Sequence, residues 1–214
     1  LYDVVKTDGP LALDAAADIE AILPNTVTIA DPLPATSALQ KTVWDQLIVL
    51  DDVDDRSTAN YLWSPAQVDQ GKAGSRLSDW LSLPFGAPET VVLPGFHTAA
   101  ESSLKRGADG HEMFLSLCGL MASGTRTILI SRWRTGGQTS HDLVREFVQE
   151  LPRTSASKAW RRSVLLAIGA EIDPQREPRI KLGPDEDLLR SDHPFFWSGY
   201  LVVDTGLRPK EGAE

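Results

Sequence analysis

Cysteine is almost absent from this chain, because Cys118 is the only one among 214 residues. A single thiol excludes an internal disulfide framework and fits a reducing compartment, so we expect a cytoplasmic protein. No apolar run approaches the roughly 20 residues that cross a bilayer, and no basic and apolar leader opens the chain, so we expect no membrane partner. The first residue is Leu1 rather than methionine, which indicates a piece of a longer protein.

Basic residues are also scarce. Lys and Arg number 21 against 30 Asp and Glu, which gives a formal charge of -9. This balance argues against a nucleic-acid partner, because phosphate contacts need clustered Lys and Arg. The phosphate-cradling Gly-x-x-x-x-Gly-Lys pattern and the Gly-x-Ser-x-Gly nucleophile elbow are both missing. The chain is 42% hydrophobic, which is enough for one sizeable core.

Strand patterns and helix patterns alternate along the chain. This order predicts an α/β domain with a mostly parallel sheet and helices on both faces. We expect strands at residues 2–6, 27–29, 46–50, 90–93, 126–131 and 200–203. We expect helices at residues 15–23, 37–44, 76–81, 110–123, 139–151 and 157–169, the first of them capped by Asp14. Residues 1–207 then form one domain, with a surface excursion at 173–192 and a mobile tail at 208–214.

The sulfur and histidine side chains on the predicted helices have structural interpretations. Cys118 recurs at helical spacing with Phe114, Leu117 and Met121, so we expect it to be buried as a small hydrophobe. His141 begins a helix, and we expect it to face solvent.

A glycine pair and a histidine in the loops before predicted elements also have structural interpretations. Gly136 and Gly137 come directly before the helix at 139–151, where they form either an anion-binding nest or a simple helix entry. His193 is expected to order the loop in which it lies.

Four stretches together resemble a known family. They are VVLPGFHTAA (91–100), GHEMFLSLCGLMASGTRTILISRW (110–133), the helical segment 139–151, and HPFFWSGYLVV (193–203). In this order they resemble the CHAT domain, a caspase-like and separase-like cysteine peptidase module. The similarity spans residues 11–205 and implies a caspase-like fold whose earliest strands are missing. Active members are often joined to helical repeats in bacterial signalling or defence, so the resemblance also implies a larger bacterial protein.

The chain departs from this family at the catalytic positions. In the family, a strand of the form VVLSAC supplies the nucleophilic cysteine, and a threonine follows two positions later; VVLPGFHT places Phe96 and Thr98 there. The family's general base is the histidine of a His-Gly pair, whose position is best matched by Asp52. A cysteine peptidase needs a thiolate and a nearby imidazole. The resemblance therefore predicts a pseudo-peptidase with no catalytic residue and no cofactor.

The former substrate cleft supplies the candidate binding residues. In an active relative the cleft would hold an extended peptide by strand addition. We expect the cleft of this chain to bind a protein or peptide partner, such as a catalytic homologue or a helical-repeat region. Phe96 is expected either to fill the cavity beside Asp52 or to pack under the loop that carries Trp133. The candidates are Asp51, Asp52, Phe96, His97, Arg132 and Trp133.

Two enzymatic alternatives remain open. The first is a hydrolase with an unorthodox catalytic set such as Asp52 with His97, although a turn histidine bonded to nearby backbone is the commoner case. The second is a metal-dependent enzyme, because Asp51, Asp52, Asp54 and Asp55 end a strand and offer oxygen ligands to Mg²⁺ or Ca²⁺. Short charge runs are more often solvated loops, so the preferred interpretation has no metal site.

Overall fold

The computed structural model describes residues 2–7, 10–30, 44–50, 88–96, 111–132, 136–177, 180, 183 and 190–206. The predicted helix at 76–81 and the predicted tail at 208–214 lie outside these residues. No helix in the described ranges is both long and apolar enough to cross a bilayer.

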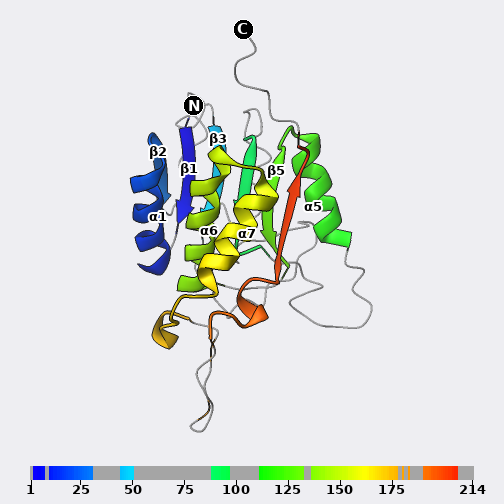
Figure 1. Ribbon diagram of the computed structural model, residues 1–214. Coiled ribbons are helices and arrows are strands. Elements are labelled where there is room, and N and C mark those ends of the chain that lie inside the picture. Colours follow the sequence, from blue (N-terminus) through cyan, green and yellow to red (C-terminus); the bar gives the residue numbers. More distant parts are fainter. Residues whose placement is uncertain are drawn as a thin grey trace, which may run out of the picture.

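Six strands form one sheet in the order β2-β1-β3-β4-β5-β6. The first five are parallel, and β6 runs antiparallel beside β5. Their carboxyl ends therefore share one edge of the sheet, which we call the carboxyl edge and which is the lower end in Figure 1. The strands are β1 (Tyr2–Thr7), β2 (Thr26–Ala30), β3 (Trp44–Leu50), β4 (Thr90–Leu93), β5 (Thr127–Ser131) and β6 (Tyr200–Asp204).

Helices cover both faces of this sheet. Three of them lie on one face and α5 packs against the other (Figure 1). The helices are α1 (Pro10–Ile22), α5 (His111–Ala122), α6 (Gln138–Glu150) and α7 (Ala156–Ala167), with short 3-10 turns η1 (Leu151–Arg153), η2 (Pro174–Arg176) and η3 (Pro194–Phe196). The predicted caspase-like α/β fold, with a mostly parallel sheet and helices on both faces, is confirmed.

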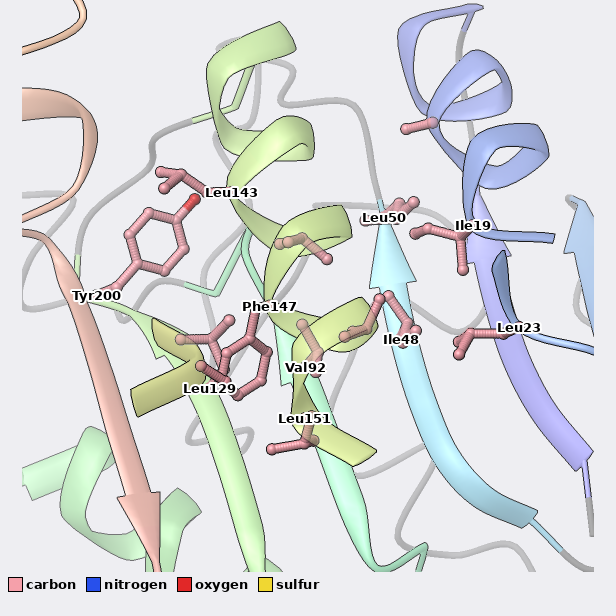
Figure 2. Packing of buried hydrophobic residues seen from close by; sticks show 14 of the residues in the cluster. Ile19, Leu23, Ile48, Leu50, Val92, Leu129, Leu143, Phe147, Leu151 and Tyr200 are labelled. Carbon is pink, nitrogen blue, oxygen red and sulfur yellow. The ribbon is translucent and has the colours of Figure 1, made fainter. Parts of the chain in front are cut away.

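Successive side chains of the central strands point to opposite faces of the sheet, and the core is therefore divided into two clusters. Ile48, Val92 and Leu129 face α1, α6 and α7, whereas the residues directly before each of them face α5. Figure 2 shows Phe147 of α6 packed over Val92 and Leu129. Because helices bury both faces, these strands read as continuous apolar runs. This burial explains why the three central strands, β3, β4 and β5, could be recognised in the sequence.

Two predicted helices are corrected at their boundaries. The first begins at Pro10 rather than after Asp14, because proline already has the φ of the first helical position and needs no amide partner there. Trp44, predicted to end a helix, is instead the first residue of β3. The rest of that predicted helix, residues 37–43, lies outside the described residues.

The orientation of α5 also differs from the prediction. Leu120 is buried and Met113 and Leu117 pack partly against the sheet, whereas Phe114 is 65% exposed and Met121 is 43% exposed. Both sets of residues have helical spacing, so periodicity alone does not decide which set faces the core. The helix is rotated about its axis relative to the prediction, so that Met113 and Leu120 face the core in place of Phe114 and Met121.

Candidate functional site

Phe96 lies at the carboxyl edge but points into the core. A tight turn follows β4, in which the Phe96 amide donates to the Leu93 carbonyl at 3.2 Å. The side chain is fully buried in the cluster that contains Leu120 and Ile130. The Ser131 hydroxyl donates to the Phe96 carbonyl at 2.7 Å and so ties the ends of β4 and β5 together.

These contacts give Phe96 a packing role. Its ring is fully buried in the cluster to which α5 contributes Leu120, with Met113 and Leu117 packed against that cluster. Asp52 and Trp133, which defined the two predicted positions of this ring, lie outside the described residues, as do Asp51 and His97.

Arg132 is the other candidate that the structure describes. It is exposed at the carboxyl edge, and its amide donates to the Gly199 carbonyl at 2.6 Å. The structure thus brings Phe96 and Arg132 to the ends of adjacent strands. The described residues contain no group of three side chains that could hold a metal ion, and the Asp51 to Asp55 cluster is not among them.

Cys118 is exposed, which corrects the prediction that it is buried. It belongs to the outward side of α5. The histidines whose side chains are described are His141, on α6 across the sheet, and His193, beside η3. The described residues therefore place no imidazole beside the thiol.

The start of α6 holds a carboxylate from a distant part of the chain. Glu177 is only 3% exposed, and its Oε1 accepts from the backbone amide of Thr139 at 2.7 Å and from the Thr139 hydroxyl at 2.6 Å. Gly136 and Gly137 have φ of 70° and 86°. A Cβ at Gly137 would overlap the Glu177 carboxylate. The glycine pair was interpreted either as an anion-binding nest or as a simple helix entry, and the structure places a carboxylate of the same chain against this helix start. Residues 173–192 are therefore not wholly a surface excursion.

His141 is buried beside this contact, which makes the prediction that it faces solvent wrong. Its side chain is 5% exposed, and Nδ1 has no hydrogen-bond partner among the described residues. Burial, helped by the positive charge of Arg176, lowers the pKa of His141 to about 4. Burial raises the pKa of Glu177, and the two hydrogen bonds from Thr139 oppose that rise.

His193 has the structural role that we predicted. It is exposed, and its Nδ1 accepts from the Phe195 amide at 3.2 Å. The contact caps η3, whose Phe196 is buried and stacks edge-to-face with Phe195. This histidine orders the approach to β6.

Comparison with known proteins identifies the family. The CHAT domain family matches residues 45–205, well over half of the chain. The chain therefore belongs to the CHAT domain family, as its sequence pattern predicted. The match starts inside β3, later than residue 11, although β1 lies between β2 and β3 in the same sheet.

Solved structures resemble the chain only distantly. A protein from Bacteroides thetaiotaomicron that is provisionally named a phosphomethylpyrimidine kinase has a TM-score of 0.43 and 9% identity, over 95% of this chain and 100% of that chain. The pyridoxal kinase of Staphylococcus aureus in complex with pyridoxal has a TM-score of 0.39 and 11% identity, over 95% and 99%. Similarity this weak carries no argument about function. No curated protein matches the chain significantly.

Proposed function

We propose that this chain is a CHAT-family pseudo-peptidase that recognises a protein or peptide partner without cleaving it. The observation that supports this proposal most is the burial of Phe96. The family pattern assigns the nucleophile to this position, and here it carries a fully buried ring in an apolar cluster. A carbon side chain in such a place has neither a lone pair to attack a carbonyl nor a proton to transfer.

Neighbouring nucleophiles do not replace the missing thiolate. Ser131 is the nearest described hydroxyl along the adjacent strand, but it is fully buried and donates its proton to the Phe96 carbonyl. Cys118 lies on the outer side of α5, away from the carboxyl edge. Neither residue has a described base beside it, and a serine or thiol without a base is a weak nucleophile.

Exposed apolar side chains on α5 support a binding role. Phe114, Leu115 and Met121 are 65%, 56% and 43% exposed and follow one another along the outward side of the helix. Apolar side chains gathered on one surface commonly mark sites of protein contact. The partner that fits this surface has an apolar contact face, as a helix from a repeat region would.

Affinity capture with quantitative mass spectrometry tests the binding role. We expect the wild-type chain to retain a specific protein from an extract of its native host, and Phe114→Ser with Leu115→Ser to reduce the retained amount at least tenfold. The matched control is Leu165→Ser with Leu166→Ser on α7, which exchanges side chains that are 60% and 49% exposed on the opposite face. Equal losses in the two variants, or no specific protein with the wild type, would contradict the proposal.

A further inference from the structure

Residues 171–177 form a strap that returns from α7 and is tied to two other helices. The Arg176 guanidinium reaches Asp14 of α1, with Nη2 and Oδ2 3.3 Å apart. The next residue, Glu177, accepts both hydrogen bonds from Thr139 at the start of α6. The strap itself is short and ordered by Asp173, whose carboxylate accepts from the Gln175 amide at 3.0 Å. Adjacent residues of one segment thus join α1 to α6.

The contact between the strap and α6 depends on the acceptor oxygen of the Glu177 side chain. The α6 amides form the positive end of a helix dipole, which favours a negative group. Gly137 leaves room for Glu177 that no side chain would leave. Glu177 is 38 residues from Thr139 in the chain, so this contact holds only while the strap is in place.

His141 makes the same region sensitive to protons. It lies within the first turns of α6, and its amide donates to the Gly137 carbonyl at 3.2 Å. Its Nδ1 is buried without a partner in the described part of the chain, and the charge on Arg176 acts on it. A proton added to Nδ1 would place a second positive charge near Arg176, in a site whose described residues offer Nδ1 no hydrogen-bond acceptor.

We propose that the strap is a pH-sensitive latch on the start of α6, and that it opens when His141 takes up a proton. Opening hydrates the imidazolium and separates it from Arg176. The latch goes beyond the proposed function and does not depend on whether the chain is catalytic.

Charged groups from every described element at this junction affect the relative stability of the closed and open forms of the latch. Asp14 and Asp18 come from α1, Asp142 and Arg145 from α6, and Asp173, Arg176 and Glu177 from the strap. Asp18 and Asp142 both pair with Arg145, at 3.4 Å and 3.1 Å. Their charges are therefore partly compensated within the closed form, whereas a protonated His141 would not be.

The two buried titrating groups of the latch act in opposite directions. Because the pKa of His141 is lowered to about 4 in the closed form, that form binds fewer protons than the open form and loses stability as the pH falls from about 6.5 towards 4. The pKa of Glu177 is raised, so the closed form gains stability as the pH falls through the range in which this carboxyl titrates. Removing one group at a time separates the two effects.

Hydrogen exchange measured by mass spectrometry, corrected for intrinsic rates, tests the latch. In Glu177→Gln, which keeps an acceptor for Thr139, we expect opening at residues 136–141 to increase about 20-fold between pH 7 and pH 5, as follows from a shift of His141 between about 6.5 and about 4. In His141→Gln we expect no increase. Peptides from β4 and β5 serve as the control and should keep their protection throughout.

Two results would overturn the latch. One is unchanged exchange in Glu177→Gln across this pH range, and the other is an increase in His141→Gln equal to that of Glu177→Gln. If His141→Gln does not fold, an NMR titration of the imidazole in the wild-type chain tests the latch instead. A His141 pKa near the ordinary 6.5 would contradict a closed latch. Each outcome is independent of any peptidase or partner assay.

Discussion

Phe96 is a buried apolar residue directly after β4, and the proposed function takes its ring as the reason that no peptidase reaction occurs at this position. At the end of a parallel strand, polar side chains usually face the ligand, but this ring faces inward and joins the cluster under α5. His141 shows the opposite case, because a group that could be solvated is buried without a hydrogen bond at Nδ1 in the described residues.

Truncation of the buried ring should therefore be costly. We expect Phe96→Ala to lower the free energy of unfolding by about 3–5 kcal/mol, the usual cost of a core phenylalanine. Phe114→Ala is the matched control, since the same atoms are removed from a side chain that is 65% exposed, and it should change stability by about 0.5 kcal/mol or less. Urea denaturation measures both. Similar losses for the two variants would mean that Phe96 is not a core residue.

At the scale of elements, the start of α6 depends on a partner far away in the sequence. Local capping is absent, because the N-cap residue Gly137 makes no side-chain hydrogen bond. The distant Glu177 supplies the acceptor. The Gly136–Gly137 pair was a visible signal of an anion site, but nothing in the local sequence says that the anion comes from the same chain.

Gly137→Ala tests this arrangement. The new Cβ would strain a backbone with φ of 86° and overlap Glu177, so we expect a loss of about 2 kcal/mol or more in the free energy of unfolding. Gly206→Ala is the control, because φ is 68° there but no atom lies within 4 Å of the added Cβ, and it should cost about 1 kcal/mol.

A double-mutant cycle separates overlap from backbone strain. If the overlap contributes, Gly137→Ala combined with Glu177→Ala should lose less stability than the sum of the two single variants. Strict additivity would show that Gly137 is required only for its backbone conformation.

For the whole molecule, the sequence was most informative where burial is two-sided. All six strands were predicted, and the central ones most directly, because runs such as Leu47–Leu50 are apolar on both faces. The orientation of α5 was not, because its exposed and buried positions are both apolar. Glu177 and His141 were missed for a related reason, since their burial comes from tertiary contacts between α1, α6 and the strap rather than from any local pattern.

The family match covers the part of the chain in which Phe96 is buried. Residues 45–205 carry the CHAT domain, while β1 and β2 extend the same sheet on the side of β3. Thus the fold extends beyond the family match. The central claim concerns the whole molecule: it is a CHAT fold without a nucleophile at the carboxyl edge.

Turnover of a broad peptide library is the most direct test of that claim. We expect no cleavage by the wild-type chain, and we expect a thiol-reactive peptide probe to modify only the exposed Cys118, at the rate of an ordinary thiol and not at all in Cys118→Ser. Cleavage that persists in Cys118→Ser and disappears in His97→Ala would contradict the account, because it would show a catalytic centre that needs no cysteine.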